Sequence, residues 1–298
     1  MNRNEIMKMA RVKLVFAMLI FGSIGLFVRN IDLSSGQIAL ARGVIGSLFL
    51  LLVGRITKQK LSQGAIRRNL LLLLLSGALI GFNWILLFEA YKYTTISKAT
   101  LSYYFAPVFV MVLSPWILKE RLEIKKILGM ILALGGMFLV TGIGEGAGKA
   151  DLLGIGFGLM AAMLYATVVL MNKFLKGLTG LETTLVQISA ASIVLLPYIL
   201  ITEDLQYKQL NSIGMILLVI VGIINTGLAY LLYFSSMKDL SGQTISVFSY
   251  IDPISAILLS VVLLGEHMSA IQVIGGILIL GGTFLSERKS MSPQTSRN

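Results

Sequence analysis

The stretches "LKERLEIKKILGMILALGG" (residues 118–136) and "LGEHMSAIQVIGGILILGG" (residues 264–282) carry the same pattern twice in one chain. In each copy a Glu is followed nine positions later by a Gly, and six positions after that by a Gly-Gly pair. The corresponding residues are Glu120 and Glu266, Gly135 and Gly281, Gly136 and Gly282, and, thirteen residues before each Glu, Pro107 and Pro253. The constant offset of 146 residues predicts an internal repeat.

The repeat extends well beyond these two stretches. An offset of 146 aligns residues 69–139 with residues 215–285 without a gap, and 20 of the 71 aligned positions are identical. Many identities are Leu or Ile, which match easily in apolar sequences, but the pair Tyr104 and Tyr250 and the repeated Pro and Glu are more specific. The earlier parts of the two halves align more weakly, with a shift of one to three residues that brings Arg42 opposite Gln187.

The composition predicts an integral membrane protein. The chain has 298 residues, of which 56% are apolar and 13% charged, and its mean hydropathy is +0.86. A soluble domain carries about a quarter charged residues, so this chain cannot cover a water-facing surface with polar side chains. It has no cysteine and one histidine, which removes disulfides, thiolate metal sites and histidine clusters.

Ten stretches have the roughly 20 mostly apolar residues that a membrane-spanning helix needs. They are 12–31, 36–54, 69–91, 97–118, 125–143, 152–172, 181–202, 212–236, 243–264 and 270–286. Each half holds five spans, an odd number, so the second half enters the membrane from the opposite side. We therefore expect an all-α integral membrane protein with ten transmembrane helices in two inverted five-helix repeats, 12–143 and 152–286. A cytoplasmic segment (1–11) precedes them and a disordered cytoplasmic tail (287–298) follows.

The distribution of Lys and Arg predicts the orientation. With a cytoplasmic N-terminus, the inside segments hold 19 of these residues and the outside segments hold 5, while Arg42 lies within the second span. Such an excess favours the cytoplasmic side, so we expect both termini inside the cell and the chain in the plasma membrane. The same bias accounts for the net charge of +11 without a nucleic-acid partner.

The paired motifs resemble those of the EamA-type family in the drug/metabolite transporter superfamily. The resemblance rests on "APVFVMVLSPWILKER…LGMILALGG" (from residue 106) and "DPISAILLSVVLLGEH…IGGILILGG" (from residue 252). The first copy departs with Lys119 where the second has Gly265, and the second has His267 where the first has Arg121. The resemblance implies a ten-helix carrier, often an exporter of amino acids or other small metabolites.

Inverted repeats favour a secondary-active or facilitative transporter, because two homologous halves can exchange conformations around one central site. The expected partners are a small-molecule substrate and the bilayer; direction, proton coupling and oligomeric state stay open. A nucleotide-sugar or sugar-phosphate carrier would need several basic cavity residues, and only Arg42 is available. A membrane-embedded lipid enzyme or a non-transporting scaffold are the alternatives of another class. The sequence shows no G-x-S-x-G, H-E-x-x-H or phosphate-loop motif, so we expect no catalytic residue, metal or cofactor.

Two charged residues within the spans are the first candidates for substrate contact, because charges inside the apolar layer usually face a cavity or a partner. Asp252 lies near the middle of its span, directly before Pro253, and could bind an amine or a proton, or form a structural ion pair with Arg42. Arg42 lies about six residues, roughly 9 Å, from the outer end of its span. It could bind a carboxylate or extend to the outer interface. Together the two side chains would suit a zwitterion.

Polar and aromatic side chains complete the candidate cavity, which we expect between the spans 69–91, 97–118, 212–236 and 243–264. They are Asn83, Trp84, Tyr104, Tyr165, Asn225, Tyr230 and Tyr250, and each could equally be a packing residue. Aromatic rings can cradle an apolar or cationic substrate.

The repeated motif itself is expected to be structural. Glu120 and Glu266 fall on opposite faces of the membrane, where each would cap the start of the next helix. The Gly-Gly pairs, 135–136 and 281–282, would let the fifth and tenth helices approach their neighbours closely. Pro107 and Pro253 are candidate kinks and gates.

Overall fold

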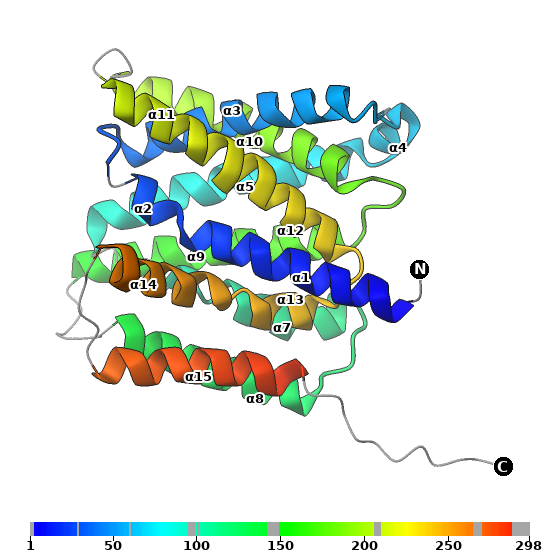
Figure 1. The fold of residues 1–298 in the computed structure, drawn as a ribbon, viewed down its shortest axis with the longest axis vertical. Helices are drawn as coiled ribbons and strands as arrows, with labels where there is room; N and C mark the ends of the chain where they lie inside the picture. Colours follow the sequence, from blue (N-terminus) through cyan, green and yellow to red (C-terminus); the bar gives the residue numbers. More distant parts are fainter. Residues whose placement is uncertain are drawn as a thin grey trace.

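The chain folds into a bundle of helices whose long axes run roughly along one direction (Figure 1). The computed structural model describes residues 3–28, 30–59, 61–94, 99, 102–141, 149–205, 210–264 and 270–287. The helices of the first half are α1 (Arg3–Gly22), α2 (Ile24–Val28), α3 (Ser35–Ile56), α4 (Gln63–Arg68), α5 (Leu70–Tyr93), α7 (Ala106–Ile117) and α8 (Ile124–Thr141). Those of the second half are α9 (Lys149–Asn172), α10 (Gly180–Thr202), α11 (Ser212–Ile220), the π-helix η2 (Val221–Leu228), α12 (Ala229–Met237), α13 (Gly242–Phe248), α14 (Ile251–Leu264) and α15 (Ala270–Glu287).

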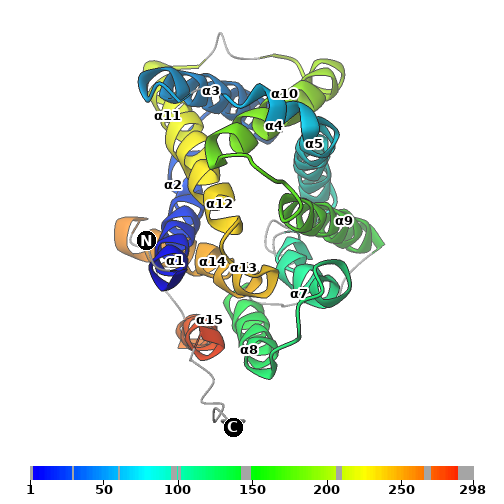
Figure 2. The same cartoon turned by 90° about the vertical axis from the view of Figure 1, so that its right-hand side faces the viewer.

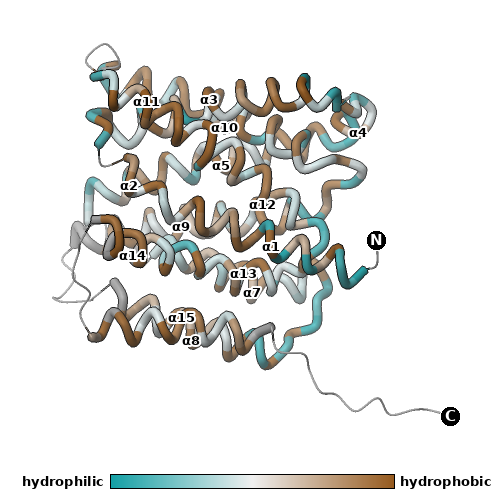
Figure 3. The backbone as a smooth tube through the Cα atoms, in the orientation of Figure 1, coloured by the Kyte–Doolittle hydropathy of each residue, from teal (hydrophilic) through white to brown (hydrophobic). Residues whose placement is uncertain are grey.

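Among the described residues, six helical segments are long and apolar enough to cross a membrane. They are Arg3–Val28, Ser35–Ile56, Leu70–Tyr93, Leu152–Asn172, Gly180–Thr202 and Ser212–Met237. Each overlaps one of the predicted spans, although the first begins at Arg3 and not at residue 12. The described residues of the other four predicted spans are also largely helical, in α7, α8, α13 with α14, and α15, but in shorter or interrupted runs. Figure 3 shows the apolar residues along the helices and the hydrophilic ones mostly at their ends, as expected of a membrane protein.

The fourth and ninth predicted spans are interrupted at equivalent places. The chain turns at residues 104–105 before α7 begins at Ala106, and at Ser249–Tyr250 before α14 begins at Ile251. Pro107 and Pro253 therefore lie in the first turn of a new helix, where a missing N–H costs no helical hydrogen bond. Each of the repeated prolines thus follows a break between two helical segments of one predicted span. Their role as kinks and gates stays a prediction.

The helices α8 and α15 pack against each other at one edge of the bundle, opposite α3, α10 and α11 (Figure 2). A Cβ atom on Gly136 would collide with the carbonyl oxygen of Gly275, and one on Gly282 with the carbonyl oxygen of Gly129. The offset of 146 residues converts each of these contacts into the other. The prediction of close helix packing is thus confirmed for Gly136 and Gly282.

Their neighbours behave differently, because a Cβ atom on Gly135 or Gly281 would meet nothing within 4 Å. Adjacent residues on a helix point in different directions, so one member of each Gly-Gly pair faces away from the contact. The prediction that Gly135 and Gly281 also line the helix contact is wrong.

Candidate functional site

A cavity of about 700 Å³ lies inside the bundle, and α1, α2, α3, α5, α7, α9, α12 and α14 all contribute to its wall. It is lined by the C-terminal halves of α1 and α5, the N-terminal half of α3 and the start of α14. These segments place it between mid-depth and the end of the bundle at which α3 begins. Of its described lining residues, only Arg42 and Asp252 are charged.

Arg42 projects from α3 onto an aromatic ring. Its guanidinium carbon lies 4.6 Å from the centroid of the Trp84 ring, within the range of a cation–π interaction. A guanidinium that lies over a ring face can still direct the N–H groups of its own plane to an acceptor. Arg42 and Asp252 line the same cavity but form no ion pair with each other among the described contacts. The structural pair considered from the sequence is therefore absent.

Asp252 lies in the first turn of α14, immediately after the turn at Ser249 and Tyr250. The phenol of Tyr104, in the equivalent turn of the first half, lies beside its carboxylate. The residue that corresponds to Asp252 under the 146-residue offset is Ala106, which also lines the cavity. The two halves thus present a carboxylate and a methyl group at equivalent positions, which makes the cavity chemically asymmetric.

Aromatic rings cover much of the remaining wall. The ring centroids of Phe21 and Tyr230 are 5.0 Å apart, and those of Trp84 and Tyr230 are 6.5 Å apart, both in edge-to-face arrangements. The ring centroids of Tyr103 and Tyr165, which also line the cavity, are 5.8 Å apart. Such a wall suits an apolar or aromatic group, or the apolar part of an amphipathic substrate.

The first predicted span breaks between α1 and α2, and residues of α2 line part of the cavity. The helical hydrogen bonds of α1 end at Ser23, and α2 continues at an angle from Ile24 (Figure 1). The amide of Asn225, in η2, donates to the carbonyl oxygen of Ile20 at 2.6 Å and to the Ser23 hydroxyl at 3.0 Å. Asn225 therefore supplies hydrogen bonds to polar groups at the break in α1, and it lies outside the cavity lining. Segments of π-helix often accompany functional sites.

Two other predicted site residues join helices and are not part of the lining. Asn83 donates to the carbonyl oxygen of Ala161 at 2.6 Å and so links α5 to α9. The buried hydroxyl of Tyr250 donates to the carbonyl oxygen of Tyr104 at 3.2 Å. The residues Arg42, Trp84, Tyr104, Tyr165, Tyr230, Asp252 and Pro107 do line the cavity, whereas Pro253 is buried beside it.

Comparison with known proteins places this architecture in a family. A sequence model of the EamA-like transporter family matches residues 9–142 and 152–288. The chain belongs to the EamA-like transporter family. An uncharacterized transporter, YxxF, of Bacillus subtilis (strain 168) is 32% identical over 279 residues, which cover 93% of this chain and 89% of the relative. An uncharacterized transporter of Archaeoglobus fulgidus is 28% identical and covers 95% of this chain and 98% of its own length.

A solved crystal structure supports the same fold. It superposes with a TM-score of 0.84 over 93% of this chain and 96% of the other, at 19% sequence identity. That identity supports the fold alone. The relatives support a membrane transporter built from apolar helices.

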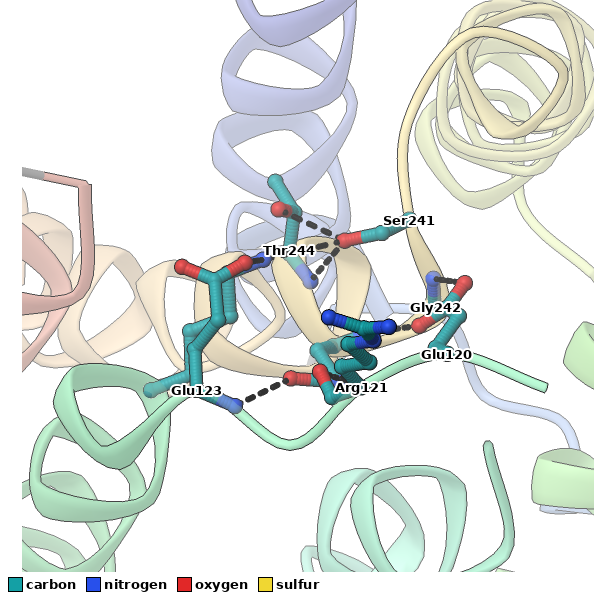
Figure 4. A network of polar contacts seen from close by, with 8 residues as sticks. Glu120, Arg121, Glu123, Ser241, Gly242 and Thr244 are labelled. Carbon is teal, nitrogen blue, oxygen red and sulfur yellow. Dashed lines mark hydrogen bonds and ion pairs between the residues drawn. The ribbon is translucent and has the colours of Figure 1, made fainter. Parts of the chain in front are cut away.

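The end of this EamA-like bundle opposite the cavity is joined by polar contacts between α7–α8 and α13 (Figure 4). The carboxylate of Glu120 accepts hydrogen bonds from the backbone N–H groups of Gly242 at 2.8 Å and Gln243 at 3.4 Å. The Gln243 amide in turn donates to the carbonyl oxygen of Arg121 at 3.0 Å. Glu120 therefore caps the N-terminus of α13 in the other half, and the prediction that it caps the next helix is wrong. Glu266 lies outside the described residues.

Two lysines strengthen this joined end. The amine of Lys126 pairs with Glu123 at 2.8 Å and donates to the Ser241 hydroxyl at 3.3 Å. The amine of Lys173, just beyond α9, donates to the carbonyl oxygen of Met237 at 2.6 Å and to that of Leu240. Burial lowers the pKa of the Lys173 amine, against the opposing attraction of nearby carboxylates that include Glu120.

Sequence reasoning missed the contribution of the first span, which supplies Met18, Phe21 and Gly22 to the cavity. These residues are apolar, and nothing in hydropathy separates a cavity-facing Phe from a lipid-facing one. The small residues of "FGSIG" (21–25) were the available signal of a helix break. No group of three or more His, Cys, Asp or Glu that could hold a metal ion occurs among the described residues.

Proposed function

We propose that this EamA-like protein is a secondary-active or facilitative carrier that exports small metabolites, such as amino acids or amines, across the plasma membrane. The observation that carries the proposal is one aromatic cavity whose described lining holds a single cation and a single anion, Arg42 and Asp252. A zwitterion would place its carboxylate at Arg42, its ammonium at Asp252 and its side chain against the rings. Each charge is then matched by a counter-charge, which offsets the cost of taking it out of water.

We propose that the chain has ten spanning helices in two inverted five-helix units, 12–143 and 152–286, with both termini in the cytoplasm. The exchangeable glycine contacts of α8 and α15 and the equivalent helix breaks before Pro107 and Pro253 support two related units. In this arrangement the described conformation has its cavity toward the outside, and the contacts of Glu120 join the cytoplasmic end. An inward-open state requires those contacts to separate.

The proposal is tested by efflux from proteoliposomes loaded with an isotopically labelled mixture of amino acids, amines and nucleosides. We expect at least one amino acid or amine to leave faster than from empty liposomes. Replacement of Asp252 by Asn keeps the size of the side chain but removes its charge, and we expect it to reduce that flux at least about tenfold, because the substrate ammonium loses its counter-charge.

The matched control is Glu89→Gln, since Glu89 pairs with Lys92 at 2.7 Å near the end of α5 and does not line the cavity. Its flux should match that of the wild type. Absence of protein-dependent flux for every compound in the mixture would contradict the carrier proposal. Undiminished flux in the Asp252 variant would contradict the role of that carboxylate.

A further inference from the structure

A second cavity, of about 420 Å³, lies away from the central one, where α3 and α10 meet the chain segment that follows α3. None of its described lining residues lines the central cavity. Its helical lining residues belong to the C-terminal part of α3 and the start of α10. These segments lie at the end of the bundle that also carries α4 and the start of α1 (Figure 1). The excess of Lys and Arg predicts that this end faces the cytoplasm.

The inner wall of this cavity is apolar. Leu50, Leu181 and Leu185 are buried and form its floor, whereas Leu51 and Leu61, at its edge, are 45% and 41% exposed. Gly54 contributes no side chain to the wall, and a Cβ atom there would be 3.4 Å from a methyl group of Leu181. The result is a groove with room for a hydrocarbon chain, open at the surface of the bundle.

The mouth of the groove is basic. Arg55, in the last turn of α3, and Lys58, just beyond it, both line the groove and are both exposed. Neither side chain forms a hydrogen bond or ion pair with a described residue. The nearest acidic side chain on α10, Glu182, is already occupied, because it accepts hydrogen bonds from the backbone N–H groups of Thr179 and Ser62.

We infer that this groove binds an anionic phospholipid of the cytoplasmic leaflet, with an acyl chain along the leucines and the phosphate at Arg55 and Lys58. Basic pockets between helices on the cytoplasmic side suit anionic headgroups. An apolar floor directly beneath two cations that pair with no described residue matches both parts of such a lipid. A free anion would match only the cations, and a neutral lipid only the floor. This inference does not depend on what the central cavity transports.

The test measures the thermal stability of the purified full-length chain in detergent as phosphatidylglycerol or phosphatidylcholine with identical acyl chains is added. We expect phosphatidylglycerol to raise the melting temperature at lower lipid concentration than phosphatidylcholine. The double variant Arg55→Gln, Lys58→Gly should need about tenfold more phosphatidylglycerol for the same shift, because two phosphate contacts are lost. Lys58 has a backbone φ of +50°, which glycine adopts readily, so this replacement is compatible with the fold.

Two further variants distinguish a lipid seated in the groove from anions attracted to the basic surface at large. Gly54→Leu keeps both charges but fills the groove, and we expect it to weaken the response to phosphatidylglycerol as well. Arg67→Gln with Arg68→Gln removes two charges from exposed positions of α4 outside the groove, and its response should equal that of the wild type.

Several outcomes would overturn the inference. One is an unchanged response in the Arg55 and Lys58 variant, and another is an equal loss in the α4 control, which would indicate general surface attraction. An equal rise in the melting temperature with soluble glycerol phosphate would show a site for free anions. Equal responses to phosphatidylglycerol and phosphatidylcholine would show that Arg55 and Lys58 do not select an anionic headgroup.

Discussion

Arg42 and Asp252 lie inside an apolar bundle, whereas most other charged residues of the chain lie at helix ends or between helices. A charge within the membrane is costly unless it faces a cavity or a partner. Both side chains face the same cavity, and the described contacts do not pair them with each other. The Arg42 guanidinium lies over the face of the Trp84 ring, and the edge of the guanidinium stays available to bind an acceptor. A lysine ammonium cannot reproduce this planar arrangement.

Replacement of Arg42 by Lys tests the role of the planar guanidinium. The positive charge remains, but the stacking on Trp84 and the two-pronged binding of a carboxylate are lost. We expect the KM for a transported amino acid to rise about tenfold with a smaller change in the maximal rate. The concentration dependence of efflux measures both quantities. Arg67→Lys, on exposed α4, is the control, and a KM equal to that of the wild type in the Arg42 variant would remove Arg42 from the binding site.

At the scale of helices, the crossing of α8 and α15 depends on which glycine of each pair is replaced. We expect Gly136→Ala to lower the free energy of unfolding by about 1–3 kcal/mol, because its Cβ would push against the Gly275 carbonyl. Gly135→Ala should instead be neutral or stabilising by up to about 1 kcal/mol, because Ala favours a helix and nothing obstructs it. Thermal denaturation in detergent compares the two variants. Equal effects would show that the two helices do not pack as described.

The helices around the central cavity show what the sequence could and could not predict. The repeat predicted that Pro107 and Pro253 occupy equivalent places, and polarity within the spans predicted that Trp84, Tyr230 and Asp252 lie at one cavity. Polarity could not distinguish a side chain that lines the cavity from one that hydrogen-bonds to a neighbouring helix. The sequence therefore predicts Asn83 and Asn225 in the cavity lining, whereas both donate hydrogen bonds to backbone carbonyl oxygens. The small residues of 21–25 could indicate the break of α1 at Ser23, but no local pattern reveals its hydrogen-bond partner, Asn225, 202 residues away.

Across the whole molecule, repeated glycines join helices, whereas the two charged residues of the cavity lining, Arg42 and Asp252, are not repeated. Gly136 and Gly282 make interchangeable contacts, whereas Asp252 corresponds to Ala106. Glu120 reaches from the first half to the N-terminus of α13 in the second, so the contact that joins one end of the bundle lies between the halves. A relative movement of the halves would separate this contact and open that end to the cavity.

The most direct test of such a movement is the accessibility of the cavity from each side of the membrane. The chain has no native cysteine, so Ser249→Cys in the cavity wall is a single reporter for a small, charged, membrane-impermeant thiol reagent. We expect rapid labelling from the outside, and we expect the added change Glu120→Gln to increase labelling from the cytoplasmic side, because the cap on α13 is weakened. Absence of labelling from the outside, or cytoplasmic labelling that Glu120→Gln leaves unchanged, would contradict a cavity that opens alternately to the two sides.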